Sequence, residues 1–370
     1  MNLSTTKSLV LALLGAATFS ALAGCAGAPP PEPDPANEAA MPPPAAPPPA
    51  APPPAAIPSA SASASAAMPT QSPEEKKKAD AARELAADRA KLDTDTAAEK
   101  TRFTPELHAE AKKLADAKYP TLDAALGQVL KGKYRKPGNP ERDKYRHPLE
   151  TLKFFGLKPN MTVIEYGPGE GWYTEILAPT LAASGKLIVT TTDPNGPPDA
   201  RSTFYGEREK RFLDNLPELY GKVDRLVIDQ KSPKFAGMDG KIDMVIVMRG
   251  VHGLQRDKLL SGFLGEVYKA LKPNGVLGVE QHRSKPDANP EESAKQGYLP
   301  EAFVIKEAEN AGFKLAGKAE VNANAKDTKD YPEGVWTLPP TYELKDKDHD
   351  KYAAIGESDR MTLKFVKVKK

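Results

Sequence analysis

A glycine-rich segment that follows an apolar stretch is the strongest candidate for ligand chemistry in this sequence. Gly167, Gly169 and Gly171 come directly after an apolar run that ends at Tyr166. Glu165 stands two residues before the first of these glycines. Glycine permits a tight turn and removes the side chains that would keep a ligand away from the backbone. A helix that starts here would present unpaired N–H groups and partial positive charge to an anion. The segment therefore predicts a main-chain site for a ligand with an anionic group.

The spacing of these glycines argues against two common nucleotide cofactor motifs. A dinucleotide fingerprint places a third glycine three residues after the second one, where it allows the helix to pack closely on the strand. That position holds Trp172 in this chain. A phosphate-binding loop needs a Gly-Lys-Ser/Thr sequence, which does not follow the glycines. A nicotinamide oxidoreductase is therefore disfavoured, and a nucleotide hydrolase of the phosphate-loop type is excluded.

The elements that must position this segment alternate between strand and helix from Arg142 onward. This alternation predicts a parallel sheet with helices on both faces. Strands are expected at 161–166, 186–191, 223–228, 242–248, 275–280, 313–321 and 361–368, and helices at 170–183, 259–271 and 299–311. The glycine-rich segment then lies between the first strand and the helix that follows it. Five parallel strands and a closing pair would make a seven-stranded sheet.

The pattern of Glu165 and the three glycines resembles motif I of class I S-adenosylmethionine-dependent methyltransferases. The resemblance extends over roughly 142–370 and includes the turn at 271–275. It implies an α/β, Rossmann-like, seven-stranded, mostly parallel sheet, with S-adenosylmethionine as cofactor. The methionine carboxylate of that cofactor would be the anion at the helix terminus. More narrowly, the segments 145–148, 171–179 and 335–340 resemble a group of bacterial predicted methyltransferases of unassigned substrate.

Two aspartates stand where this family places further contacts to the cofactor. Asp193 ends the second strand, 22 residues after Gly171, where the family has an acid on the ribose hydroxyls. Asp229 ends the third strand, where the family often has a polar contact to the adenine. A carboxylate suits the ribose because it can accept from two hydroxyl groups. The alternative for both aspartates is a turn-forming role, since loop aspartates commonly bond their own backbone.

Candidate catalytic residues follow the fourth strand, because sites in such sheets lie beyond the carboxyl ends of the strands. Methyl transfer from a sulfonium requires chiefly alignment of the reacting atoms, and a base only when the acceptor must lose a proton. His252 is the first candidate base, with a structural loop histidine as the alternative. Arg249 is the candidate to orient an acidic acceptor, or else it pairs within the protein. No metal site is expected.

The N-terminal region predicts export and anchoring rather than a folded domain. Lys7 and the short apolar run 9–17 precede Leu22-Ala23-Gly24-Cys25, which resembles the bacterial lipoprotein signal. The run is shorter than the ~18–20 residues that span a bilayer. The resemblance implies cleavage before Cys25, the only cysteine, and lipid attachment to it. Ala26 favours the periplasmic face of the outer membrane over retention at the inner membrane. An ordinary secretory signal is the alternative.

Four segments are expected along the chain: a signal peptide at 1–25, a tether at 26–72, a helical lead-in at 73–140 and the methyltransferase-like domain at 141–370. The tether is rich in Pro, Ala and Ser, a composition that favours extended polyproline geometry. In the lead-in, Ser72 and Glu75 predict a capping box for a solvated helix to about residue 90. The segment 322–359 is predicted to be a lid on the substrate side.

Charge gives little support for nucleic-acid binding. The chain has 52 basic and 50 acidic residues, a net charge of +2, so it has no strong overall field. The basic segment 131–146 contains interleaved tyrosines, but acidic residues and prolines interrupt it. A connector or a cover of the active site is the favoured interpretation, and the oligomeric state stays open.

These features lead to two functional hypotheses. The first is S-adenosylmethionine-dependent methyl transfer to an unidentified small-molecule or lipid-like acceptor. The Asn/Asp-Pro-Pro-Tyr signature of many amino-group methylases is absent after the fourth strand, which disfavours nucleobase and protein amide acceptors. The second is a non-catalytic, lipid-anchored binding module that retains the fold. The export signal favours the second, because S-adenosylmethionine is made in the cytoplasm, whereas the intact glycine motif favours the first.

Overall fold

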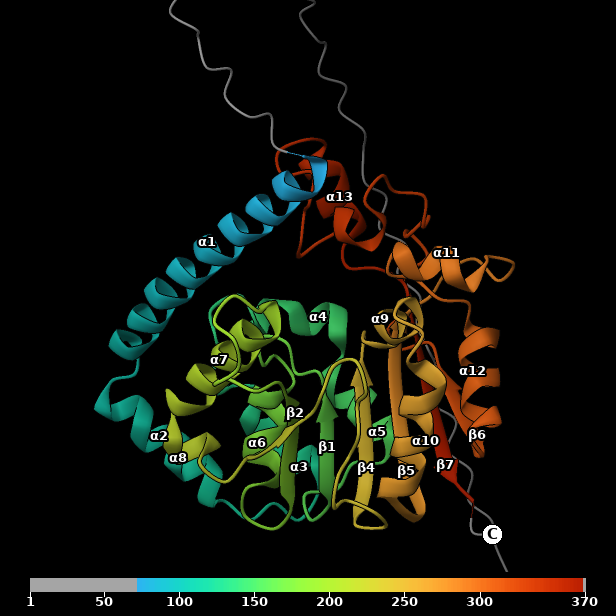
Figure 1. The fold of residues 1–370 in the computed structure, drawn as a ribbon. Helices are drawn as coiled ribbons and strands as arrows, with labels where there is room; N and C mark the ends of the chain where they lie inside the picture. Colours follow the sequence, from blue (N-terminus) through green and yellow to red (C-terminus); the bar gives the residue numbers. More distant parts are fainter. Residues whose placement is uncertain (1–71, 369–370) are drawn as a thin grey trace, which may run out of the picture. The chain divides into compact units, whose positions relative to one another are not determined.

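A seven-stranded sheet organises the structure, a computed structural model that describes residues 72–368 (Figure 1). The predicted signal peptide, Cys25 and nearly all of the tether lie outside the described residues. The strands are β1 Thr162–Tyr166, β2 Lys186–Thr191, β3 Asp224–Val227, β4 Ile242–Met248, β5 Leu271–His282, β6 Phe313–Ala319 and β7 Arg360–Lys367. Their spatial order is β3-β2-β1-β4-β5-β7-β6.

The first five strands are parallel, and β7 is antiparallel to both β5 and β6. This confirms the predicted Rossmann-like, seven-stranded, mostly parallel sheet. The chain reverses its winding direction at β1, which has β2 on one side and β4 on the other. Ligand sites in open parallel sheets lie beyond the carboxyl ends of the strands at such a switch point. The glycine-rich segment leaves β1 at this place.

Helices cover both faces of the sheet because successive strand residues point in opposite directions. Val163, Val189 and Ile246 pack with α5 (Pro148–Phe155) and α6 (Thr174–Leu181) on one face. On the other face, the intervening strand residues pack with α9 (Val251–Arg256), α10 (Leu260–Ala270) and α12 (Glu301–Asn310). The remaining helices are α1 Pro73–Arg102, α2 Pro105–Asp116, α3 Leu122–Val129, α4 Asp143–Arg146, α7 Arg201–Asp214, α8 Pro217–Tyr220, α11 Pro290–Lys295 and α13 His349–Ile355. Two short 3₁₀ turns, η1 Pro140–Arg142 and η2 Gly334–Thr337, complete the elements.

The helical lead-in is joined to the sheet domain, and all described residues fall within one compact unit. The capping box of Ser72 and Glu75 is present, as predicted. Helix α1 extends twelve residues beyond the predicted end because ion pairs hold it against α7: Arg89 bonds Glu207, and Arg211 bonds Asp93. Helices α2 and α3 share the core cluster of α6. None of the described helices is long and apolar enough to span a membrane.

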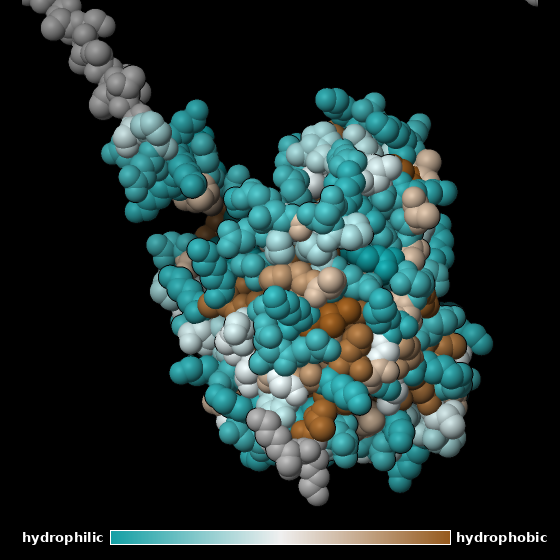
Figure 2. Space-filling view, turned by 90° about the vertical axis from the view of Figure 1, so that its right-hand side faces the viewer, coloured by the Kyte–Doolittle hydropathy of each residue, from teal (hydrophilic) through white to brown (hydrophobic). Residues whose placement is uncertain are grey.

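The surface seen from the β6 edge is mostly hydrophilic, with apolar patches between the hydrophilic residues (Figure 2). Among the described residues, only three large hydrophobic side chains are exposed: Tyr205, Val227 and Val368. Most large apolar side chains of the described residues are therefore buried or partly buried.

Candidate functional site

The three glycines of the loop after β1 all have left-handed backbone conformations, but they serve two purposes. Their φ angles are 60°, 64° and 83° for Gly167, Gly169 and Gly171. A Cβ atom on Gly167 or Gly169 would meet no protein atom within 4 Å, whereas a Cβ on Gly171 would lie 2.5 Å from the Phe212 ring. Gly171 is thus required for packing against α7. The first two glycines leave open space where a ligand can reach the backbone.

This loop separates two cavities, and Gly167, Pro168 and Gly169 line both of them. The smaller one, which we call the β2 cavity, has a volume of about 200 Å³ and lies against the end of β2 and helix α7. The larger one, which we call the arginine cavity, has a volume of about 620 Å³. Its walls come from η1 and α4, the ends of β4 and β5, and the segments 335–341 and 357–358. Together they have the size expected for a small-molecule site.

A buried glutamate that the sequence analysis missed lines the β2 cavity. Glu209 on α7 is 7% exposed, and its Oε1 atom has no hydrogen-bond partner among the described residues. Burial raises the pKa of Glu209 to about 7, although Thr191 and two nearby arginines act in the opposite direction. The helical spacing of the sequence could have indicated that Glu209 is buried. Glu209 occupies the core-facing stripe of α7, three residues after buried Gly206 and four before buried Leu213.

The two aspartates predicted for the cofactor line neither cavity. Asp193 is exposed, and its Oδ1 accepts a hydrogen bond from the Asn195 backbone N–H at 2.9 Å. Asp229 is also exposed, and its Oδ1 accepts from the Lys231 backbone N–H at 2.8 Å. Both side chains therefore form the local turns that were the alternative at these positions.

Glu165 positions the loop rather than facing either cavity. Its carboxylate is buried and accepts a hydrogen bond of 2.7 Å from the Thr174 hydroxyl at the start of α6. Burial raises the pKa of Glu165 to about 8. Directly after β1, the Gly167 N–H donates a hydrogen bond of 2.9 Å to the hydroxyl oxygen of Thr190 on β2. These bonds fix both ends of the glycine loop to buried side chains.

Arginines dominate the arginine cavity, and several of their guanidinium groups surround the carboxylate of Glu357. Glu357 accepts from Arg142 Nε at 2.7 Å, from Arg146 Nε at 3.2 Å and from an Arg360 Nη at 2.9 Å. Burial by itself would raise the pKa of Glu357, but the surrounding guanidinium groups, including that of Arg249, lower it to about 2. Glu357 is thus an anion at neutral pH and holds segments from both ends of the domain together.

Arg249 occupies the predicted place at the end of β4, in an uncommon backbone conformation. Its φ is 57°, in the left-handed region, and its N–H donates to the Glu280 carbonyl at 2.6 Å. Non-glycine residues in this region cost about 1–3 kcal/mol and cluster at functional sites. The Arg249 side chain lines the arginine cavity, and its buried Nη1 has no partner in residues 72–368. The alternative considered for Arg249, pairing within the protein, is not supported by a hydrogen bond or ion pair of its side chain within residues 72–368.

His252 also lies at the arginine cavity, beside a second histidine that the sequence analysis did not select. The His252 and His282 rings are 5.8 Å apart, and His282 Nδ1 lies 2.6 Å from the Ser358 hydroxyl. Burial, together with cationic neighbours, lowers the pKa of His252 to about 4 and that of His282 well below its ordinary value. Both rings are neutral at physiological pH and can accept a proton. The signal for His282 was its place at the end of β5, the neighbour of β4.

The segment 322–359, predicted as a lid, contributes several apolar side chains to the lining of the arginine cavity. Val335, Trp336, Pro339 and Pro340 line the cavity, and the Trp336 ring lies 6.0 Å from that of His252. The basic segment 131–146 also contributes to the lining, through Arg142 and Arg146. Trp172 is stacked beneath Arg146 at 4.7 Å and donates to the Asn139 carbonyl.

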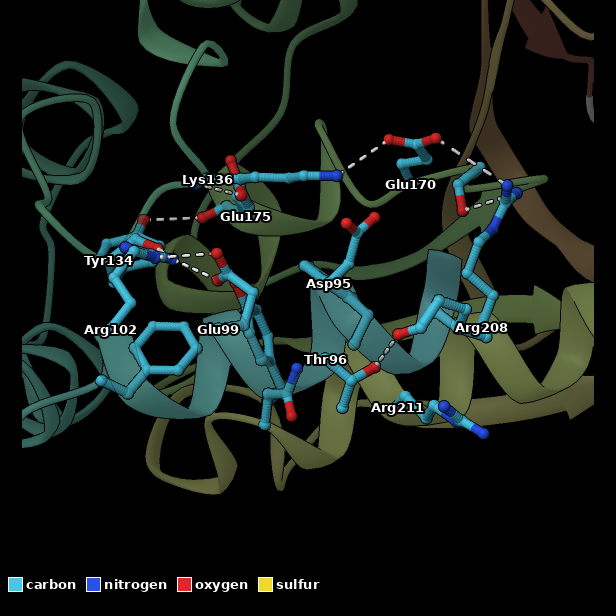
Figure 3. Close-up of a pocket in the computed structure, with 16 residues that line it drawn as sticks. Asp95, Thr96, Glu99, Arg102, Tyr134, Lys136, Glu170, Glu175, Arg208 and Arg211 are labelled. Carbon is cyan, nitrogen blue, oxygen red and sulfur yellow. Dashed lines mark hydrogen bonds and ion pairs between the residues drawn. The ribbon is translucent and has the colours of Figure 1, made fainter. Parts of the chain in front are cut away.

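A third hollow lies behind the glycine loop, between α1 and the sheet domain (Figure 3). Glu170 spans its upper side, with Lys136 at 3.1 Å and Arg208 at 4.0 Å, and Glu99 and Arg102 of α1 close the other end. Its volume is about 100 Å³, smaller than that of the β2 cavity. Gly169 and Glu170 are among its lining residues, so part of the glycine loop forms its wall. No cluster of potential metal ligands occurs within residues 72–368.

Comparisons with known proteins give matches to solved structures alone, because no family model and no curated protein matches. A SAM-dependent methyltransferase from Aquifex aeolicus is 20% identical and covers 62% of this chain and 94% of its own, with a TM-score of 0.40. A 1,6-didemethyltoxoflavin-N1-methyltransferase from Burkholderia thailandensis, with S-adenosylhomocysteine bound, is 13% identical over 62% and 80% of the two chains, with a TM-score of 0.38. A geranyl diphosphate methyltransferase in complex with SAM is 11% identical over 66% and 90%, with a TM-score of 0.40.

Proposed function

We propose that this protein is an S-adenosylmethionine-dependent methyltransferase that acts on a small-molecule or lipid-like acceptor. One observation carries the proposal: a loop of open, left-handed glycines separates a cavity with an orphaned carboxylate from a cavity with arginines and neutral histidines. A ligand that crosses the loop would place different chemical groups in the two cavities. S-adenosylmethionine is such a ligand, and when bound it supplies an electrophilic methyl group.

The residues at the loop fit the adenosine side of this cofactor. Backbone groups of Gly167 and Gly169 are open to a ligand, and Glu209 supplies an acceptor for two ribose hydroxyls. The β2 cavity has no other carboxylate in its lining. The orphaned Oε1 of Glu209 is the kind of buried atom that a bound ligand satisfies, since buried polar atoms are rarely unpaired.

On the acceptor side, the residues of this chain can bind, orient and deprotonate. Arg249 supplies a fixed cation at the end of β4, and His252 and His282 supply neutral imidazoles for a proton. The 335–341 segment contributes apolar side chains to the wall of the cavity. A base with a pKa of about 4 is weak at neutral pH, so the main contribution of these residues would be alignment.

The affinity for S-adenosylmethionine is expected to rise with pH through about 7, because the ribose hydroxyls donate to the ionised form of Glu209. Glu209→Gln should weaken binding at pH 8 by about tenfold or more and abolish the pH dependence. Asp193→Asn is the matched control and should bind like the parent. Calorimetric titration measures the affinities of the parent, Glu209→Gln and Asp193→Asn, with NAD as the comparison ligand. Each protein is the full chain and carries Cys25→Ser, which prevents lipid attachment.

Two outcomes would contradict these statements. If S-adenosylmethionine does not bind to the parent chain at millimolar concentration, the active enzyme is excluded, and the alternative of a non-catalytic binding module with this fold stands. If Asp193→Asn loses affinity and Glu209→Gln does not, the ribose site is the one predicted from the family resemblance, and the turn at Asp193 rearranges when the cofactor binds.

We also propose that Cys25 carries a lipid that anchors the protein at the periplasmic face of the outer membrane. The order of charge, apolar run, small residues and cysteine supports this proposal. Cys25→Ser is expected to abolish incorporation of labelled palmitate in cells and to move the protein into the soluble fraction. A mature chain that retains residues 1–25 would contradict the anchor and would also remove the conflict with the cytoplasmic supply of cofactor.

A further inference from the structure

The arginine cavity holds more buried cationic donors than the described residues can pair. Nη atoms of Arg142, Arg146 and Arg249 are buried and have no hydrogen-bond partner in residues 72–368. The Arg146 residue is 3% exposed, so water does not readily solvate it. Buried N–H donors are nearly always paired in folded proteins, and unpaired ones at a cavity point to a missing partner.

Positive formal charges also outnumber negative ones at this cavity. Four guanidinium groups surround the buried carboxylates of Glu280 and Glu357: Arg360 lies between the two, and Arg142 and Arg146 pair with Glu357. The fourth, Arg249, lies near Glu357 and near Glu165, whose pKa burial raises to about 8, so that Glu165 is mostly protonated at neutral pH. Two positive charges therefore remain without a partner. The other carboxylate in the cavity lining belongs to exposed Glu170, which pairs with Lys136 at 3.1 Å.

The remaining titratable groups that face these arginines add no negative charge. His252 and His282 are neutral, and cationic arginines contribute to holding them so. Glu165, which interacts with Arg249, has a pKa raised by burial and is mostly protonated at neutral pH. The Tyr173 hydroxyl, which donates to Glu280 at 2.9 Å, has a pKa raised well above its ordinary value by burial. Buried positive charge is costly unless it is paired, so an anion in the cavity would relieve this cost.

We propose that the arginine cavity recognises a phosphate or carboxylate group of the methyl acceptor through Arg142, Arg146 and Arg249. This rests on the proposed function, because it assigns the chemical class of the acceptor at the same site. Guanidinium groups match the geometry of both oxyanions through paired N–H donors. Trp336, Pro339 and Pro340 line the same cavity, so the acceptor combines an anionic group with an apolar body.

The inference is tested with simple anions on the full chain carrying Cys25→Ser, saturated with S-adenosylhomocysteine. Inorganic phosphate, pyrophosphate and succinate are titrated by calorimetry at low ionic strength. We expect at least one of them to bind with a dissociation constant of about 1 mM or lower. Comparison of phosphate binding with succinate binding shows whether the cavity prefers a phosphate or a carboxylate group. Arg249→Gln should weaken this binding by about tenfold or more.

The control is Arg83→Gln, because Arg83 pairs only with Asp80 in the same exposed helix. It removes the same charge and should leave anion binding unchanged. Arg249→Gln should fold, since it removes an unpaired cation, and its thermal unfolding temperature is expected to equal or exceed that of the parent. This second measurement separates loss of binding from loss of structure.

Two results would overturn the inference. The first is that none of the three anions binds to the saturated chain. The second is that Arg249→Gln weakens binding of S-adenosylhomocysteine but not of 5′-methylthioadenosine, which lacks the methionine carboxylate; the arginine then serves the cofactor. Failure of the proposed function gives a different result, in which the anions bind while S-adenosylhomocysteine does not.

Discussion

Gly169→Val is expected to lower the affinity for S-adenosylmethionine by about a hundredfold or more while the chain stays folded. The backbone at Gly169 has a φ of 64°, and a β-branched residue in this region costs about 1–3 kcal/mol. The new side chain would project from a residue that lines both cavities, into space where no protein atom lies within 4 Å of its Cβ. Calorimetry measures the affinity, and thermal unfolding measures the stability.

Gly171→Ala provides the matched comparison within the same loop. Its Cβ would lie 2.5 Å from the Phe212 ring, so this smaller substitution should reduce the stability of the fold. Gly169→Val should mainly reduce binding, and Gly171→Ala should mainly lower the unfolding temperature. Unchanged affinity in folded Gly169→Val would show that the ligand does not cross the glycine loop.

Glu357→Ala is expected to destabilise the fold by about 3–5 kcal/mol, because removal of one partner of a buried ion cluster leaves uncompensated charge. Glu357 is 5% exposed and accepts from three arginines of η1, α4 and β7. Without its carboxylate, these cations face one another across the arginine cavity. Urea denaturation followed by circular dichroism measures the change in the free energy of unfolding.

The acid stability of the protein should depend on the same residue. The folded-state pKa of Glu357 is about 2, below the ordinary value of 4.5. Its stabilising contribution is therefore complete above pH 4.5 and is lost as the pH falls towards 2. Asp123→Ala, which breaks an exposed pair with Lys153, is the control and should change stability little. Equal stability losses in the two variants would contradict the special role assigned to Glu357.

The sequence alone determined the fold class and the glycine loop. Alternating strands and helices have local signatures, because side-chain periodicity distinguishes the two. The loop was equally accessible, since left-handed backbone conformations need glycine and three glycines in five residues are a local pattern. The positions of Arg249 and His252 at the site could also be predicted, because both residues follow β4 and sites in such sheets lie beyond the carboxyl ends of the strands.

The tertiary structure alone decided which carboxylate faces the β2 cavity. Asp193 has the sequence position that the family resemblance implies, but its carboxylate accepts a hydrogen bond from the Asn195 backbone N–H within the local turn. Glu209 lies sixteen residues later, on a helix that the fold places against the end of β2. Sequence position fixes where a Cα lies along a strand, but side-chain direction depends on hydrogen bonds that compete within the turn.

The charged residues of the arginine cavity could not be grouped from the sequence either. Arg142, Arg146, Arg249 and Glu357 come from three distant parts of the chain, and no local pattern connects them. Their grouping depends on β7 pairing antiparallel with β5, which brings the C-terminal segment to the ends of the parallel strands. The sequence determined the elements and the loop because those are local; the charge of the site was decided by long-range packing, because electrostatic energy depends on distance in space.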